Sequence, residues 1–311
     1  MTEDELVEMR PERRWSGPRV VRSGGHWWVD NRGFCRRVHF AATVPAAEVR
    51  RPTAYCWAYH TLLPAEDAEA ANVWSPLHLV EDLANYGEHS LDSTQRKHVR
   101  RCRRAFELVQ LTDAGMLAEQ GWPIYSANAR RLGLPLELDE EAFRAQAAAW
   151  AEDDRRLIVG ALQDGRLVGY LETRAIGHTA YLDEIRLSET ALKANLSAYL
   201  HYEAAQLYRQ SGLVQEVCAG LPLPQRPGVI EFKRRMGMPI VHRPARFWSP
   251  APIARLFHLA KPAVYYRATG IPPRNMKPPG DPATAPSRSP YHSPRPVRGR
   301  TRSGVASGTS S

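Results

Sequence analysis

Three strand-like segments in a row, followed at once by a helical pattern, restrict the fold more than any other feature of the chain. The segments cover 157–162, 167–173 and 180–187 and are rich in apolar and β-branched residues. Asp164-Gly165 has the composition of a type I′ hairpin turn, and Gly177 lies in the second connection. Because connections this short join antiparallel neighbours, the sequence predicts a three-stranded antiparallel meander.

The pattern after the meander predicts alternating helices and strands. A helix is expected over 189–210, with core-facing residues at helical spacing: Leu192, Leu196, Tyr199, Leu200, Ala204 and Leu207. Gly212 is a natural end for this helix, since glycine readily adopts the left-handed conformation that closes one. We expect a strand over 213–219, a short helix over 228–236 and a strand over 239–247 to follow.

A strongly basic segment lies before the meander. Asp92 is placed to cap a helix, and Gln95 stands where a capping-box-like pair would be completed. An apolar stripe at helical spacing follows, formed by Val99, Cys102 and Ala105/Phe106. The remaining circumference carries six cations between residues 96 and 104 and no acid. A strand over 107–111 and helices near 113–132 and 139–152 complete this part.

The cations of the basic segment are compatible with three roles. They could clamp a nucleic acid, hold the phosphate of a small molecule, or form a solvated helix face, which is the commonest meaning of a run of surface charge. The net charge of the whole chain does not decide between them. It is +9, but residues 271–311 alone carry seven Lys/Arg against one acid, which leaves +3 for the rest.

The two ends of the chain differ from its centre. Residues 15–85 predict short strands and loops, with a turn at 30–33 between two of the strands. Residues 271–311 hold nine prolines and little that could form a core, so we expect a disordered tail. The four cysteines and the histidines show no metal-ligand spacing, and we expect no metal. With no apolar run long enough for a signal peptide or a bilayer, we expect a cytoplasmic protein without stable membrane insertion.

The order of these elements resembles the GNAT acyltransferase superfamily. DGRLVGYLETR is similar to the strand pair before the acyl-donor site, and EFKRRMG at 231–237 resembles the FK-x-x-(F/M)-G ending of GNAT-related proteins. The basic helix before the strand at 107–111 is similar to Fem-type peptidoglycan aminoacyltransferases. The resemblance covers about 90–248. It implies an α+β fold, with a GNAT-like mixed, mostly antiparallel sheet flanked by helices.

The resemblance also implies a division of the chain. A β-rich region over 1–89, for which a degenerate half of the fold is one interpretation, precedes a GNAT-like domain over 90–250. A terminal helix over 251–270 and the tail over 271–311 follow. Many GNAT enzymes hold the pyrophosphate of CoA with a glycine-rich turn after the third meander strand. Here Arg186, Leu187, Ser188 and Thr190 occupy that place without a glycine, which leaves both acyl-CoA and an aminoacyl-tRNA as donors.

Three residues are candidates for catalysis. The resemblance places Asp183 and Glu184 where GNAT enzymes carry a base that deprotonates an amine, although strand-end carboxylates paired with Arg186 or Arg174 are the commoner explanation. Lys233 stands where Fem-type enzymes place a lysine near the acyl donor, and a cation there would stabilise a developing oxyanion; a surface lysine beside Arg234 and Arg235 explains it equally. The cations expected to meet an anionic substrate are Arg96, Lys97, Arg100 and Arg101.

The leading hypothesis is an N-acyltransferase that moves an acyl or aminoacyl group from acyl-CoA or aminoacyl-tRNA to an amine by direct attack. The amine would belong to a small molecule or to a cell-wall polysaccharide precursor. The alternative is a catalytically inactive GNAT-fold binding or scaffold protein. No P-loop, dinucleotide-binding fingerprint or Ser-His-Asp pattern points to another class of enzyme, and the oligomeric state is left open.

Overall fold

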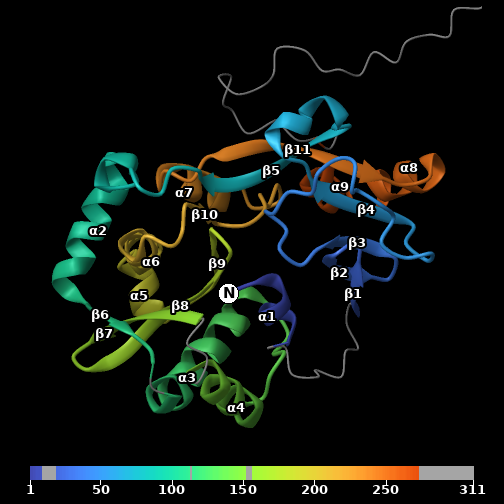
Figure 1. Ribbon diagram of the computed structural model, residues 1–311. Helices are drawn as coiled ribbons and strands as arrows, with labels where there is room; N and C mark the ends of the chain where they lie inside the picture. Colours follow the sequence, from blue (N-terminus) through green and yellow to red (C-terminus); the bar gives the residue numbers. More distant parts are fainter. Residues whose placement is uncertain (9–18, 113, 152–155, 273–311) are drawn as a thin grey trace, which may run out of the picture. The chain divides into compact units, whose positions relative to one another are not determined.

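The computed structural model describes residues 1–8, 19–112, 114–151 and 156–272 (Figure 1). These residues belong to one compact unit, Met1–Pro279. The tail predicted to be disordered lies, apart from its first two residues, outside the described residues.

Within the described residues, eleven strands form one mixed sheet in the order β1-β2-β3-β4-β11-β5-β10-β9-β8-β7-β6. Their bounds are Arg19–Ser23 (β1), His26–Asn31 (β2), Phe34–Arg37 (β3), Ala58–Leu62 (β4), Val73–Val80 (β5), Glu107–Gln110 (β6), Arg156–Gln163 (β7), Arg166–Ile176 (β8), Thr179–Leu187 (β9), Glu216–Cys218 (β10) and Ile240–Trp248 (β11). Between neighbouring named strands, β3–β4 and β9–β10 are parallel and the other pairs of known register are antiparallel. The sheet is mixed and mostly antiparallel, as predicted. It is larger than a GNAT sheet over 90–250 because β11 pairs with both β4 and β5.

The predicted meander is present as β7, β8 and β9. Asp164 and Gly165 form its first turn with φ of 51° and 74°, the left-handed values that a type I′ turn needs. The β8–β9 register contains a bulge: Glu172 pairs with Glu184 and Thr173 with Leu182, so Asp183 is an extra residue in β9. A β-bulge changes the direction in which the neighbouring side chains point, and bulges are frequent beside active sites.

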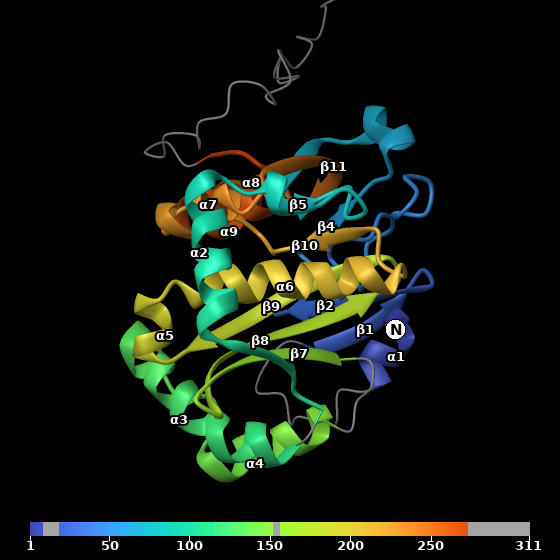
Figure 2. The ribbon, with the colours of Figure 1, turned by 90° about the vertical axis from the view of Figure 1, so that its left-hand side faces the viewer.

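Helices cover both faces of the meander (Figure 2). Their bounds are Glu3–Glu8 (α1), Ser93–Ala105 (α2), Ala114–Leu132 (α3), Glu140–Ala151 (α4), Glu189–Lys193 (α5), Leu196–Ser211 (α6), Pro227–Arg235 (α7), Ala251–Ala260 (α8) and Pro262–Thr269 (α9). Ile158 and Val159 show why two faces are covered. Alternation along β7 sends Val159 into the core under α2 and α6, and Ile158 into the core under α3 and α4.

The predicted helix over 189–210 is in fact two helices. Asn195 adopts a left-handed conformation, with φ of 62°, and separates α5 from α6. Asparagine tolerates this conformation better than most residues, so the break costs little. Because the break turns α5 away from the stripe of α6, Leu192 is exposed rather than part of the core. Leu196, Tyr199, Leu200 and Ala204 are buried as predicted.

Two other predicted elements also differ. The strand expected over 213–219 is reduced to Glu216–Cys218, and Leu213 is largely exposed. The terminal helix expected over 251–270 is divided into α8 and α9 at Lys261, whose backbone is non-helical and is followed by Pro262. Proline disfavours a helical residue before it, which explains the division.

The basic segment forms α2 as predicted. Asp92 caps it through a 2.7 Å hydrogen bond from the backbone N–H of Gln95. The side-chain oxygen of Gln95 has no partner among the described residues, so the reciprocal half of the capping box is not formed. Val99, Cys102 and Phe106 are buried, whereas Ala105 is exposed. The helix packs against α6 through this apolar stripe.

Candidate functional site

Strands β9 and β10 are paired for only three residues. Glu216, Val217 and Cys218 pair with residues 179–181 at the start of β9. Beyond Cys218 the chain bonds to β5 instead, since the N–H of Ala219 donates to the carbonyl of His78 and the N–H of His78 donates to Gly220, both at 2.9 Å. From residue 182 onward, β8 is the only strand paired with β9 in the described part of the chain. We call the place where the two strands part the β9–β10 junction.

Lys233 of α7 reaches this junction. Its ammonium donates a hydrogen bond to the carbonyl of Ala219, the first residue after β10. Burial lowers the pKa of Lys233, while the nearby Cys218 raises it. No carboxylate pairs with the ammonium among the described residues. A partly buried cation without an acidic partner can still bind developing negative charge.

Asp183 approaches the same place from β9. Its carboxylate lies 3.3 Å from the guanidinium of Arg174. Burial raises the pKa of the Cys218 thiol to about 12, and smaller effects come from Lys233, which lowers it, and Asp183, which raises it. Because β9 and β10 are parallel and Cys218 with Tyr181 is their last pair, Ala219 and Asp183 both follow the end of the pairing. Lys233, through its bond to Ala219, and Asp183 thus both lie at the β9–β10 junction.

Glu184 points elsewhere. Its carboxylate is ion-paired with Arg186, and its side chain is 53% exposed. The Arg186 guanidinium in turn lies 5.4 Å from the ring centre of Tyr125 on α3. Both carboxylates therefore make the ion pairs that were the alternative to a catalytic role.

The four residues predicted to hold CoA lie around the start of α5. Leu187 is buried and Arg186 is engaged by Glu184. The hydroxyl of Ser188 caps α5 by accepting a 3.3 Å hydrogen bond from the N–H of Ala191, and it lies 3.0 Å from the hydroxyl of Thr190. Two hydroxyls at a helix start could meet a phosphate, but the helix is only five residues long.

Much of the charge on α2 is neutralised within the molecule. Arg100 and Arg103 both pair with Glu88, at 2.8 Å and 3.0 Å, and Arg103 also pairs with Glu203 at 2.7 Å. These pairs hold α2 against its neighbours, including α6. They account for two of its six cations.

The four predicted substrate-binding cations of α2 divide into two kinds. Arg100 is paired as above, and Arg101 donates a 2.7 Å hydrogen bond to the carbonyl of Ala194. Arg96 and Lys97 make no ion pair or side-chain hydrogen bond with the described residues. The structure thus places the two kinds on one helix without bringing them to the β9–β10 junction.

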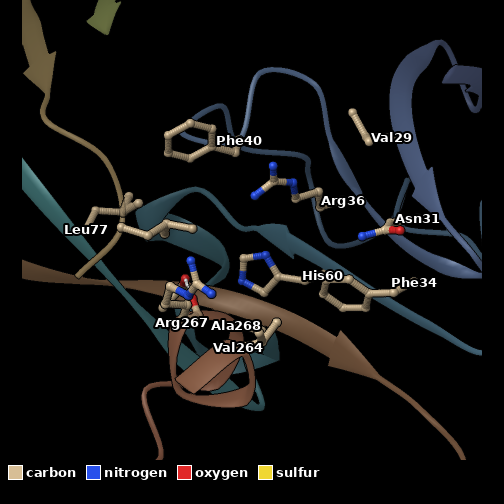
Figure 3. A pocket seen from close by; sticks show the side chains of 12 residues that line it. Val29, Asn31, Phe34, Arg36, Phe40, His60, Leu77, Val264, Arg267 and Ala268 are labelled. Carbon is tan, nitrogen blue, oxygen red and sulfur yellow. Dashed lines mark hydrogen bonds between the residues drawn. The ribbon is translucent and has the colours of Figure 1, made fainter. Parts of the chain in front are cut away.

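The sequence analysis missed a basic cavity of about 290 Å³. Figure 3 shows the side chains of Arg36, His60 and Arg267 converging on it from β3, β4 and α9. The other residues that line it are Val29, Asn31, Phe34, Phe40, Ser75, Leu77, Leu221, Val264 and Ala268. None of the lining residues is acidic. We call this the basic cavity.

The positive charges in the basic cavity repel one another. The pKa of Arg36 is lowered by the protein that surrounds it and by the positive charges of Arg267 and Arg174, although solvent reaches Arg36 through the cavity. Burial lowers the pKa of Arg267 as well. Burial, and then Arg36, lower the pKa of His60 to about 4. The cavity therefore carries positive charge without compensation from its own lining.

Only a weak signal in the sequence could have indicated this cavity. His60 interrupts the apolar run AYHTLL, and Arg267 follows two tyrosines in VYYRATG. A polar residue within a buried strand or helix requires a reason, but each one alone is more often structural. The signal becomes specific only once the fold brings residues 36, 60 and 267 together.

Two further findings concern membrane spans and metal ligands in the described residues. None of the helices is both long and apolar enough to cross a bilayer. Nor do three or more His, Cys, Asp or Glu side chains gather anywhere in the described ranges as a metal site would require.

No protein-family model and no curated protein matches the sequence. Solved structures do match. The C-terminal DUF2156 domain of a protein named as a lysylphosphatidylglycerol synthetase, from Agrobacterium fabrum, superposes with a TM-score of 0.53 at 15% identity, over 86% of this chain and 92% of that one. FemX gives a TM-score of 0.56 at 9% identity, over 83% of this chain and 98% of that one.

L-PGS from Bacillus licheniformis is similar to the same extent, with a TM-score of 0.53 and 10% identity over 86% of this chain and 96% of that one. These matches extend well beyond the 90–248 region that the sequence motifs cover. At such low identity they establish fold and not activity. The chain therefore has a GNAT/Fem-like fold.

Proposed function

We propose that the chain transfers an acyl or aminoacyl group to an amine at the β9–β10 junction. The observation that carries this proposal is the partly buried ammonium of Lys233, held where the two strands part and without an acidic partner among the described residues. The GNAT/Fem-like fold supports transfer of this general class. The donor would be a thioester of CoA or an ester of tRNA.

The chemistry assigns a role to each group at the junction. The amine nitrogen attacks the carbonyl carbon of the donor, a C–N bond forms, and the C–S or C–O bond to the carrier breaks. Lys233 would stabilise the negative charge that develops on the carbonyl oxygen. Asp183 would accept the amine proton, directly or through a water, with Arg174 holding the carboxylate in place. The leaving sulfur or oxygen then takes the proton that Asp183 accepted, directly or through a water, which restores the carboxylate.

The position of the donor follows from the fold. In this proposal Ser188 and Thr190, at the start of α5, contact the phosphate groups of a CoA donor. Arg96 and Lys97 on α2 remain available for a tRNA donor, since neither has a partner among the described residues. The acceptor is an amine of a small molecule or of a cell-wall precursor.

Two neighbouring variants test the assignment of the base. Asp183→Asn and Glu184→Gln each replace a carboxylate by an amide of the same shape. Purified full-length protein would be screened with a panel of acyl-CoAs and charged tRNAs against pooled amines. We expect Asp183→Asn to lower kcat by about 10²-fold or more, as for loss of a general base, and Glu184→Gln to change it less than about threefold. Full activity of Asp183→Asn would refute the role of Asp183, and loss in Glu184→Gln would transfer that role to Glu184.

The ion pairs of both carboxylates favour one other function, that of a GNAT-fold binding or scaffold protein. Such a protein would bind donor or acceptor but show no turnover in the same screen. Turnover above the rate without protein, and sensitive to Asp183→Asn, would exclude it.

A further inference from the structure

We propose that the basic cavity binds the carboxylate or phosphate group of a small molecule. One part of this inference rests on the proposed function: we take that molecule to be the acceptor, an amine that also carries an anionic group. The binding site itself is argued from the cavity alone.

The two arginines of the basic cavity carry positive charge that no acidic side chain in its lining balances. The guanidinium of Arg36 makes no hydrogen bond or ion pair with any described residue, and Arg267 uses only its Nε, which donates to the carbonyl of Ala263 at 3.3 Å. No carboxylate lines the cavity. Arg36 remains open to solvent and Arg267 is only partly buried, so water solvates these charges when no ligand is bound. An anion in the cavity supplies the missing partner, and two guanidinium groups offer the paired N–H donors that carboxylates and phosphates accept.

His60 has a buried ring nitrogen without a hydrogen-bond partner among the described residues. Its side chain is more than nine-tenths buried, it lines the cavity, and its Nε2 has no hydrogen-bond partner in the described part of the chain. Buried polar atoms without a partner are rare, so each one requires an explanation. The Nε2 atom has almost no accessible surface, so a bound oxyanion would accept a hydrogen bond from it only after a small shift of the ring, whereas the two guanidinium groups can donate directly.

The volume and lining of the basic cavity limit the size and shape of the ligand. A volume of about 290 Å³ is at the lower end for small-molecule sites and too small for a folded polyanion. Apolar side chains also line the cavity, namely Phe34, Phe40, Leu77, Leu221 and Val264, and Figure 3 shows those it labels on several sides of the polar groups. The ligand therefore has an anionic head that meets the arginines and a short apolar or weakly polar body.

The basic cavity lies close along the chain to the β9–β10 junction. Leu221 lines the cavity, and Ala219, two residues earlier, accepts the hydrogen bond of Lys233. Arg174 pairs with Asp183 and lies 5.5 Å from the ring centre of Tyr181, which in turn lies 4.9 Å from the ring centre of Phe40 in the cavity lining. One short segment and one arginine thus connect both places, so a molecule anchored by its anion can present an amine to the junction.

The binding experiment uses the full chain and simple probes. Isothermal titration at low ionic strength would measure the affinity for butanoate, for inorganic phosphate and for butanamide, which has the shape of butanoate without its charge. We expect butanoate or phosphate to bind, butanamide to bind at least tenfold more weakly, and affinity to fall as salt is added. Which of the two anions binds more tightly distinguishes a carboxylate from a phosphate ligand. Equal binding of butanoate and butanamide would overturn the inference.

Variants locate the binding. Arg36→Met and Arg267→Met should each lower the affinity for the more tightly bound anion at least tenfold. Arg36→Lys keeps the charge but loses the paired N–H donors of the guanidinium group, so it should lower the affinity less. Arg144→Met on α4, whose arginine pairs with Glu140 at the surface, is the control and should leave the affinity unchanged. Because Arg36→Met removes a repelled charge, we expect its Tm to equal or exceed that of the parent, which separates loss of binding from loss of folding. Unchanged affinity in both cavity variants, or equal loss in the control, would contradict the proposal.

The same variants separate this inference from the proposed function. Lys233→Met should abolish transfer but leave anion binding intact. If no donor supports transfer yet Arg36→Met still abolishes binding, the anion site stands and the proposed function fails. If transfer is found, Arg36→Met should raise KM at least tenfold for an amine that carries a carboxylate or phosphate, and not for a neutral amine. An unchanged KM for both would refute the identification of the ligand with the acceptor.

Discussion

Acidification from pH 7 to pH 5 should remove at least about 6 kcal/mol from the free energy of unfolding, because three buried histidines and the partly buried His39 have pKa values lowered by burial and are held neutral. His60, His78 and His201 are 9%, 1% and 7% exposed. Burial lowers the pKa of each to about 4. In His78 and His201 the Nδ1 atom lies 2.9 Å and 2.7 Å from the backbone carbonyls of Met238 and Ser197, which suits the neutral ring as donor.

The direction follows from which state binds more protons. In the unfolded chain a histidine has a pKa of about 6.5, so between pH 6.5 and pH 4 the unfolded state is protonated and the folded state is not. The stability that each ring contributes is complete above pH 6.5 and is lost as the pH falls towards 4. For a pKa that falls from about 6.5 to about 4, the loss between pH 7 and pH 5 is about 2 kcal/mol per histidine. Three rings account for most of the stability of a typical domain.

Urea unfolding followed by tryptophan fluorescence, at half-unit steps from pH 8 to pH 4.5, measures this dependence. We expect a flat profile above pH 7 and a decline of about 1 kcal/mol per pH unit for each histidine below pH 6. His60→Gln should reduce that slope by roughly one quarter, because it removes one of four rings whose pKa burial lowers to about 4, His39 being the fourth. A profile that stays flat from pH 7 to pH 4.5 would show that the rings are protonated in the folded state, and would refute the burial argument.

Three substitutions test the packing that positions the site, each by urea unfolding at pH 7.5. Gly237→Ala should destabilise the protein by about 2 kcal/mol or more, because Gly237 has φ of 73° and a Cβ there would lie 2.6 Å from the carbonyl oxygen of Ser90; a change below 0.5 kcal/mol, roughly the effect of a neutral surface substitution, would contradict that geometry. Asp92→Ala should cost about 1 kcal/mol through loss of the α2 cap, whereas Asp92→Asn, which can still cap, should cost less. Leu196→Ala should cost about 3 kcal/mol, since Leu196 is fully buried at the start of α6; Leu192→Ala on exposed α5 is its control and should cost little.

Features set by a few neighbouring residues could be predicted from the sequence. The turn at Asp164-Gly165 and the cap at Asp92 depend on local backbone chemistry, and both are present in the structure. The break at Asn195 could not be predicted, because leucines continue at helical spacing on both sides of it. Whether the chain kinks there depends on how α5 and α6 pack, which is not encoded in the spacing.

The basic cavity could not be predicted for a different reason. Its three polar residues, Arg36, His60 and Arg267, are separated by 24 and 207 positions in the chain. They meet because β11 pairs with β4 and β5, and α9 then packs against β5. Long-range pairings of this kind leave no periodic signal in the sequence. The candidates at the β9–β10 junction were found because family motifs marked them, not because the residues alone required it.

The measurement that tests the central claim most directly is the rate of acyl transfer by Lys233→Met. The parent, Lys233→Met and the control Arg234→Gln, whose arginine pairs with Glu231 on the exposed side of α7, would be compared with a single productive donor and amine. If Lys233 stabilises the oxyanion at the β9–β10 junction, its loss lowers kcat by about 10²–10³-fold with little change in KM, and the control keeps the parent rate. A Lys233→Met protein that folds and transfers at the parent rate would contradict the assignment of the junction as the site of transfer.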